Sequence, residues 1–210
     1  MADLEAIKEK VLKGDAPGVK ELVQQALDAG DDPEVIFFDG LIAGMKLIIG
    51  KFKRNEAYIP EVLISARAND AGMELVQPIL EKLDYKPKAR LLLGTVKGDL
   101  HDIGKNLVGM SFRGQGYEVI DLGVDQSDDT FVQAAKEHNP DVIGLSALLT
   151  TTMPQMKIII DALKNGGVET PVIVGGAPVT QDYADEIGAA GYASDAATAV
   201  EKADELLNLS

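Results

Sequence analysis

The sequence has 210 residues and a net charge of −14, with 46% hydrophobic and 26% charged residues. This balance is ordinary for a globular protein, and the acidic charge argues against a nucleic-acid partner, because a phosphate backbone needs a basic surface. The chain contains no cysteine, which excludes disulfides, thiolate metal sites and a cysteine nucleophile. A charged N-terminus and the lack of a long uninterrupted apolar run predict a cytoplasmic protein that has neither a signal peptide nor a membrane span.

Residues 1–84 are predicted to form a helical domain. Apolar residues recur there at helical spacing, and two helices open on an aspartate N-cap with a proline close behind. These pairs are Asp15 with Pro17 and Asp32 with Pro33. Proline suits the first turn of a helix because the amide that it lacks has no partner there.

Two longer helical patterns follow, and the first of them is the helix that opens at Asp32. Residues 33–52 are apolar around most of the helix circumference, which predicts that the helix is largely buried. The last apolar pattern runs from Ile59 to about Leu83, and Pro78 within it predicts a kink or an early end. Four antiparallel helices with short connections predict a four-helix bundle.

Residues 85–90 are polar and contain a proline, so they are predicted to be a linker, followed by a second domain over residues 91–210. In that domain, short apolar runs alternate with helical patterns. Continuously apolar strands separated by helices predict a five-stranded parallel sheet, flavodoxin-like (Rossmann-like), with helices on both faces. Such folds bind ligands at the carboxyl ends of their strands. The candidate strands are residues 89–96, 117–123, 140–149, 170–176 and 190–194.

The end of the first strand carries a histidine between acids, in Gly98-Asp-Leu-His101-Asp-Ile-Gly104. A carboxylate at Asp99 suits a hydrogen bond to one ring nitrogen of His101, which frees the other nitrogen to bind a metal or accept a proton. The same acids also suit the capping of a helix that begins near Ile103. On these residues alone, the capping loop is the better interpretation.

The ends of the third and fourth strands carry small residues. Ser146 is followed by three threonines, and these hydroxyls suit either a polar site or a turn before a helix at Pro154. Gly175 and Gly176 suit either a tight turn or close approach of a ligand to the sheet.

Together, the three strand ends form one spaced pattern. D-x-H-x-x-G is followed by 41 residues, then S-x-L, then 26 residues, then G-G. This pattern resembles the signature of cobalamin-binding domains of the kind in methionine synthase, a family that also places a helical bundle over the cofactor. Over its whole length the chain is similar to the small corrinoid proteins of anaerobic methyltransferase systems, which serve methanol, methylamines, glycine betaine or aryl methyl ethers.

The resemblance implies a cofactor, cobalamin or methylcobalamin, and a role for each motif residue. His101 becomes the lower axial ligand of cobalt after the cofactor's own base has left the metal, and Asp99 is its hydrogen-bonding partner. Thr152 stands where methionine synthase has a serine that extends this chain of hydrogen bonds. Small residues would line the slot for the cofactor's tail. The implied cofactor-binding residues are Gly98, Asp99, Leu100, His101, Asp102, Ile103, Gly104, Ser146, Leu148, Thr150, Thr152, Gly175, Gly176, Ala177, Tyr58 and Val62.

The bundle is expected to cover the upper face of the corrinoid. Tyr58, Val62, Leu63 and Met73 are candidates for an apolar lid, although each also suits an ordinary bundle core. The linker would then act as the hinge that lets partners reach the cobalt. His138 ends a predicted helix and is interpreted as a surface residue that favours the helix dipole.

The implied function is methyl carriage, with cobalt cycling between Co(I) and methyl-Co(III). The implied partners are a substrate:corrinoid methyltransferase, a second methyltransferase acting on tetrahydrofolate or coenzyme M, and a reductive activase for Co(II). The chain would be a methyltransferase component and not a complete enzyme. The alternatives are a cobalamin-dependent sensor, the B12-binding subunit of an adenosylcobalamin mutase, and a flavodoxin-like domain without cobalamin.

Overall fold

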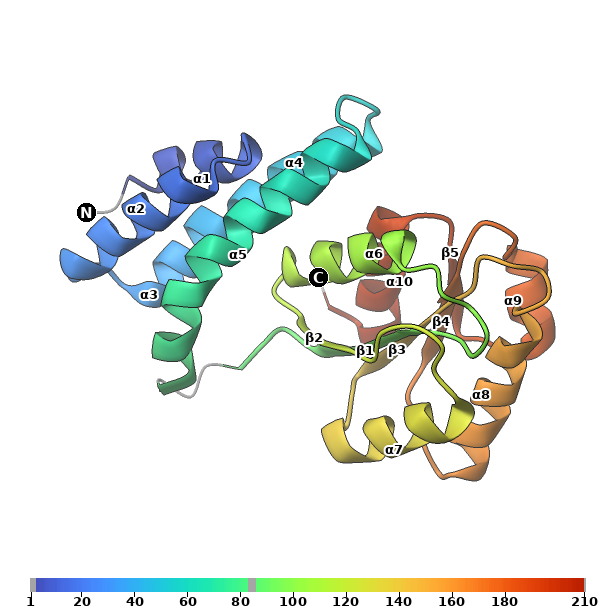
Figure 1. The fold of residues 1–210 in the computed structure, drawn as a ribbon. Coiled ribbons are helices and arrows are strands. Elements are labelled where there is room, and N and C mark those ends of the chain that lie inside the picture. The colour runs from blue at the N-terminus through green and yellow to red at the C-terminus, as the bar shows by residue number, and fades with distance from the viewer. Residues whose placement is uncertain (1–2, 83–85, 210) are drawn as a thin grey trace. The chain divides into compact units, whose positions relative to one another are not determined.

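The computed structural model describes residues 3–82 and 86–209, and the chain divides into two compact units (Figure 1). The first, the helical unit, comprises Met1–Pro87 and Arg113–Gly116. The second, the α/β unit, comprises Lys88–Phe112 and Tyr117–Ser210. Among the described residues, none of the helices combines the length and the hydropathy that crossing a bilayer requires.

The helical unit contains the four predicted helical segments. The two aspartate caps form as predicted, since Asp15 accepts a hydrogen bond from the Gly18 amide at 3.0 Å and Asp32 accepts one from the Glu34 amide at 2.9 Å. The elements are α1 (Leu4–Leu12), α2 (Ala16–Asp28), a continuous run of α3 (Pro33–Val35), the π-helix η1 (Ile36–Ile42) and α4 (Ala43–Lys53), and α5 (Ile59–Lys82).

The third helical segment differs from the regular buried helix that its composition predicts. Its middle part, η1, has the wider π-helical turn, whose i to i+5 spacing brings Ile36 and Leu41 onto one face, and both are fully buried. Its circumference is also less buried than predicted, because Phe38 and Leu47 are 42% and 49% exposed. Gly44 allows α1 to approach closely, since a Cβ atom there would lie 2.7 Å from Cβ of Val11.

Helix α5 continues through Pro78 to Lys82, so the early end predicted at the proline does not occur. Its buried side includes Val62, Ala66 and Val76, which supports the predicted core face of this helix. Leu83, the last residue of the predicted pattern, lies outside the described residues.

The α/β unit has a five-stranded, wholly parallel sheet in the order β2-β1-β3-β4-β5, the flavodoxin-like order. The predicted fold is therefore confirmed. The strands are β1 (Arg90–Thr95), β2 (Glu118–Asp121), β3 (Val142–Ser146), β4 (Val172–Gly175) and β5 (Gly191–Ala193). The helices are α6 (Ile103–Arg113), α7 (Asp128–His138), α8 (Pro154–Asn165), α9 (Gln181–Ile187) and α10 (Ala196–Leu207). Strand β1 thus begins inside the segment predicted as a linker.

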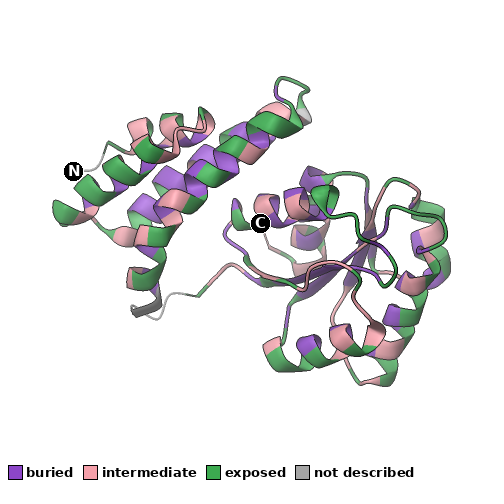
Figure 2. Ribbon diagram, in the orientation of Figure 1, coloured by how far each residue is buried: buried purple, intermediate pink, exposed green. Residues whose placement is uncertain are grey.

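Helices cover both faces of the sheet, which explains the continuously apolar strands (Figure 1). Successive side chains of a strand point to opposite faces. Leu92 accordingly belongs to the core beneath α7, α8 and α9, whereas Leu91 and Leu93 belong to the core beneath α6 and α10. Figure 2 shows the central strands β1, β3 and β4 as largely buried, whereas the edge strand β2 is exposed or intermediate.

The register of the sheet aligns the strand ends that carry the motif. Thr95 pairs with Ser146, Ser146 pairs with Gly175, and Gly175 pairs with Ala193. The loops that follow β1, β3 and β4 therefore leave the sheet side by side at its carboxyl edge, although their residues lie far apart in the sequence.

Candidate cofactor site

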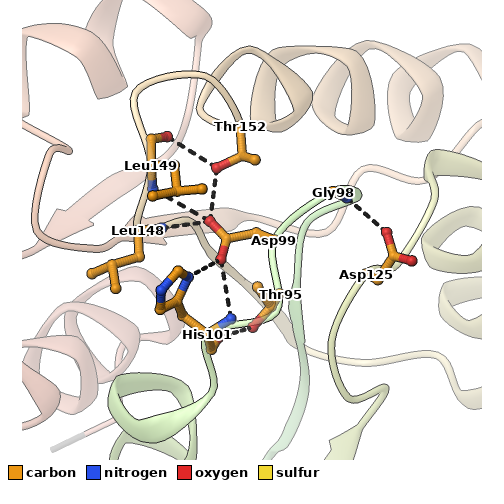
Figure 3. A network of polar contacts seen from close by, with 8 residues as sticks. All are labelled: Thr95, Gly98, Asp99, His101, Asp125, Leu148, Leu149 and Thr152. Carbon is orange, nitrogen blue, oxygen red and sulfur yellow. Dashed lines mark hydrogen bonds and ion pairs between the residues drawn. The ribbon is translucent and has the colours of Figure 1, made fainter.

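Asp99, in the loop after β1, is the centre of a polar network at this edge (Figure 3). Its side chain is completely buried. One carboxylate oxygen, Oδ1, lies 2.7 Å from Nδ1 of His101 and accepts the His101 amide at 3.1 Å. The other, Oδ2, accepts the Thr152 hydroxyl at 2.7 Å and the Leu148 amide at 2.8 Å. The network therefore joins the loops after β1 and β3.

The hydrogen bonds determine the charge of this carboxyl group. Burial raises the pKa of Asp99, but hydrogen bonds from Thr152, the Leu148 amide and His101 outweigh burial and hold that pKa well below its ordinary value. Asp99 is therefore an anion at neutral pH, and a carboxylate can only accept hydrogen bonds. The proton between Asp99 and His101 accordingly lies on Nδ1.

In a neutral His101 ring, this hydrogen bond leaves the lone pair of Nε2 available. The His101 side chain is half exposed, and Nε2 has no hydrogen-bond partner among the described residues. A neutral imidazole held in this tautomer by a carboxylate is a typical metal ligand, and the same nitrogen can also accept a proton.

The surroundings favour a metal that brings most of its own ligands. No group of three His, Cys, Asp or Glu side chains suited to a metal occurs in the part of the chain that the structure describes. Within two residues of His101, Leu100 and Ile103 are 72% and 69% exposed. A single nitrogen flanked by exposed apolar side chains fits a flat organic macrocycle that already coordinates its metal, and does not fit a hydrated ion.

Two glycines of the motif occupy different structural environments, which give different reasons for glycine at each position. Gly176 has φ +138°, and a Cβ atom there would lie 1.9 Å from the Ala147 carbonyl oxygen, so the backbone itself requires glycine. A Cβ atom at Gly104 would meet nothing within 4 Å. Packing within the chain therefore gives no reason for glycine at 104, whereas close approach of a ligand to the backbone would.

The remaining predicted residues divide between the two units. Ser146 is the last residue of β3, and Thr150 lies exposed in the loop that follows it. Ala177, which follows the glycine pair, is also exposed. Tyr58 and Val62 belong to the helical unit, where Tyr58 is exposed and Val62 is buried, and their part in cofactor binding stays a prediction.

The predicted helix-capping acid, Asp102, lies directly before α6, and among the described residues its carboxylate bonds the side chain of Asn106 and not a backbone amide of the helix. Asp102 accepts the Asn106 amide through its backbone carbonyl at 2.7 Å and the Asn106 side chain at 3.2 Å, so it stabilises the start of α6. Asp99 is directed to His101 and Thr152 instead. The two acids beside His101 thus have separate tasks.

Sequence reasoning missed three residues around this loop. The buried Thr95 donates its hydroxyl to the His101 carbonyl at 2.9 Å, and Asp125 accepts the Gly98 amide at 2.7 Å. The buried Lys105 makes an ion pair with the partly exposed Asp121. The available signals were a polar residue that ends an apolar strand and a lysine on the buried side of α6.

Comparison with known proteins also indicates that the chain binds a metal-containing macrocycle. Two family models, each described as a B12 binding domain, match residues 3–77 and 89–201. The second covers more than half of the chain and includes the whole network. The chain belongs to the family of B12-binding corrinoid proteins.

Similar corrinoid proteins match over nearly the full length. A corrinoid protein of Desulfitobacterium hafniense (strain Y51) is 41% identical, over 99% of this chain and 98% of its own. Trimethylamine corrinoid protein 2 of Methanosarcina acetivorans is 41% identical, over 93% of this chain and 92% of its own. The crystal structure of the methanol:cobalamin methyltransferase complex MtaBC from Methanosarcina barkeri matches with a TM-score of 0.91 and 32% identity, over 99% of this chain and 80% of that one. Cobalamin is thus the cofactor of this corrinoid protein.

Proposed function

We propose that the chain carries a methyl group on cobalamin, with His101 as the lower axial ligand of cobalt. The observation that carries the proposal is the Asp99–His101 pair, in which a buried carboxylate holds one ring nitrogen and leaves Nε2 free. When bound, the corrinoid supplies a cobalt centre that accepts a methyl group as Co(I) and gives it up as Co(III).

The residues of the chain would hold and tune that cofactor. The Asp99 carboxylate would make His101 a better electron donor by accepting a hydrogen bond from its Nδ1–H, and Thr152 holds Asp99 in place by donating to it. We assign the slot for the cofactor's tail to the neighbouring strand ends, with Ser146, Leu148, Thr150, Gly175, Gly176 and Ala177. Tyr58 and Val62 are the proposed contacts on the upper face.

We infer the partners from the names of the relatives. Trimethylamine corrinoid proteins and the methanol:cobalamin methyltransferase complex are among the similar proteins. A methyltransferase for a methylamine or for methanol would therefore load this chain, and a second methyltransferase would pass the methyl group to tetrahydrofolate or coenzyme M. A reductive activase would return cobalt from Co(II) to the active state.

The axial ligand is best tested with isotopes. The protein is labelled with ¹⁵N-histidine and loaded with cob(II)alamin, and its electron paramagnetic resonance spectrum is recorded. A ¹⁵N ligand from the protein splits the cobalt lines into doublets, whereas the cofactor's unlabelled base splits them into triplets. We expect doublets, their loss in His101→Ala, and their retention in the matched control His138→Ala. Triplets in the unsubstituted protein would show that the cofactor's own base stays on cobalt.

Methyl carriage needs a separate assay. The Co(I) form is mixed with a trimethylamine or methanol methyltransferase and a ¹³C-labelled substrate, and the ¹³C-methyl signal of the corrinoid is followed. We expect methylation with one of these enzymes and none without enzyme. Protein purified with its native cofactor should release no adenosyl group on illumination, and such a release would favour the mutase or sensor function.

A further inference from the structure

The loop after β2, residues 122–126, contacts the His101 loop, residues 96–102, on a side that the Asp99 network does not use. In Figure 3, Asp125 lies on one side of this loop, and Leu148 and Thr152 lie on the other. The motif that the family resemblance singles out includes no residue of the loop after β2.

Asp125 binds the backbone of the His101 loop twice. Its Oδ1 accepts the Gly98 amide at 2.7 Å, and its own amide donates to the Asp99 carbonyl at 3.0 Å. These two groups lie on either side of the Cα atom that carries the Asp99 side chain. Asp125 therefore fixes the stretch of backbone from which the carboxylate reaches His101.

The conformation of Asp125 supports a specific role. Its φ is +56°, a left-handed value that most L-residues avoid and that Asn and Asp tolerate best after glycine. This conformation directs both its amide and its carboxylate at the neighbouring loop. A residue that only closed a turn would not need both groups there.

The loop that presents Asp125 is itself held against β1. The Thr95 amide donates to the Gly123 carbonyl at 2.9 Å, and the Gln126 amide donates to the Thr95 carbonyl at 2.9 Å. The Gly123 amide in turn donates to Asp121 at 2.8 Å. Thr95 then donates its hydroxyl to the His101 carbonyl at 2.9 Å. Hydrogen bonds through Thr95 thus connect the loop after β2 to the His101 loop.

We propose that Asp125 is a positioning residue for His101, which presents Nε2 to the cobalt by holding the backbone at Gly98 and Asp99. This inference rests on the proposed axial role of His101. The Asp99 network sets the tautomer of the ring, and Asp125 sets the place of the loop that carries both residues.

Three substitutions separate the contribution of the acceptor oxygen of Asp125 from that of its left-handed backbone conformation. Asp125→Asn keeps an acceptor oxygen and tolerates the left-handed conformation. Asp125→Gly keeps the conformation but loses the acceptor. Asp125→Ala loses the acceptor and adds strain. Asp129→Ala removes a neighbouring exposed acid in α7 and is the matched control.

The readout is the doublet signal of ¹⁵N-histidine-labelled protein loaded with cob(II)alamin, with corrinoid retention after gel filtration measured in parallel. A hydrogen bond to a charged acceptor affects an equilibrium by about tenfold. We therefore expect the ratio of histidine-ligated to histidine-free cobalt to fall about tenfold in Asp125→Gly and further in Asp125→Ala. The fall should be smaller in Asp125→Asn, which keeps a neutral acceptor, and Asp129→Ala should stay close to the unsubstituted protein.

Each other result contradicts the inference. Doublets of equal intensity in all variants would show that Asp125 does not position His101. A signal lost in Asp125→Ala but intact in Asp125→Gly would show that only the backbone conformation matters. Equal loss of the doublet and of retained corrinoid in Asp125→Gly would show a general structural role. Absence of doublets from the unsubstituted protein would overturn the axial role of His101 instead.

Discussion

Two acid–base pairs at the carboxyl edge of the sheet have opposite patterns of exposure. In the Asp99–His101 pair the carboxylate is completely buried and the base is half exposed. In the Lys105–Asp121 pair the base is only 2% exposed and the carboxylate is 28% exposed. In the first pair, the buried acid orients the exposed base and leaves one of its nitrogens accessible. In the second pair, the only side-chain nitrogen of the base is buried and bonded to its partner.

The bonding of the two bases confirms this difference. Lys105 donates to both Asp121 and Asn106, so its charge is directed to groups of the protein. Asp121 also accepts the Gly123 amide and thereby joins α6 to the loop after β2. The first pair leaves a ring nitrogen accessible, and the second stabilises the loops that surround it.

The largest effect on stability is expected at Lys105. Lys105→Ala removes a buried partner of an ion pair and its packed alkyl chain, which should lower the free energy of unfolding of the apoprotein by about 3 kcal/mol. Lys105→Met keeps the volume of the alkyl chain and should lose about 1 kcal/mol, because the partly exposed Asp121 can be hydrated. Urea unfolding measures both.

The matching change in the other pair is His101→Ala. Because water can replace this half-exposed side chain beside Asp99, the apoprotein should lose less than about 1 kcal/mol, even though the proposed cobalt ligation is abolished. A loss at His101 as large as that at Lys105 would show that the histidine is structural, and the contrast between the pairs would fail.

An intermediate loss of apoprotein stability is expected on substitution of Thr152, whose hydroxyl donates a hydrogen bond to the buried Asp99. Thr152→Val removes the hydroxyl without changing the shape and should destabilise the apoprotein by about 1.5 kcal/mol, since a buried charge loses one of its donors. Thr152→Ser restores the donor and should recover most of that loss. A Thr152→Ser variant less stable than Thr152→Val would indicate that the methyl group, and not the hydroxyl, supports the network.

A smaller loss of stability than at Thr152 is expected at Asp195, an acid outside both pairs that caps α10 through the Ala197 and Thr198 amides. Burial raises the pKa of Asp195, but bonds from Thr198, Ser194 and Ala197 outweigh it and lower that pKa. A lowered pKa means that the stabilisation is present above the unfolded value of about 3.9 and is lost as the pH falls below it.

Asp195→Ala should therefore lower the free energy of unfolding by about 1 kcal/mol at pH 7. The difference in stability from the unsubstituted protein should shrink below about pH 4. Thermal unfolding at pH 7, 5 and 3.5 compares the two proteins. A gap that persists undiminished at the lowest pH would mean that the ionised carboxylate is not what caps the helix.

Most of the fold could be predicted because local patterns decide it. Apolar periodicity, the proline-assisted caps at Asp15 and Asp32, and the uniformly apolar strands each act through neighbouring residues. The π-helical turn over Ile36–Ile42 could not be predicted, because it depends on how that segment meets the neighbouring helices and not on its own composition.

The candidate site was predictable only as a set of spaced residues. Asp99 and His101 carry a visible signal because they are two residues apart in a loop between a strand and a helix. Leu148 was predicted for its side chain, yet the structure brings its backbone amide to Asp99. A backbone donor carries no sequence signal, since every residue except proline has one.

The sequence by itself determined the two-part organisation, the parallel sheet and the motif at its strand ends, because these depend on periodicity and spacing along the chain. Only the tertiary structure decided which partner of each acid–base pair is buried and that Asp125 binds the His101 loop. Those outcomes depend on the strand order β2-β1-β3, which sets residues separated by 26 or more positions within hydrogen-bonding distance at one edge.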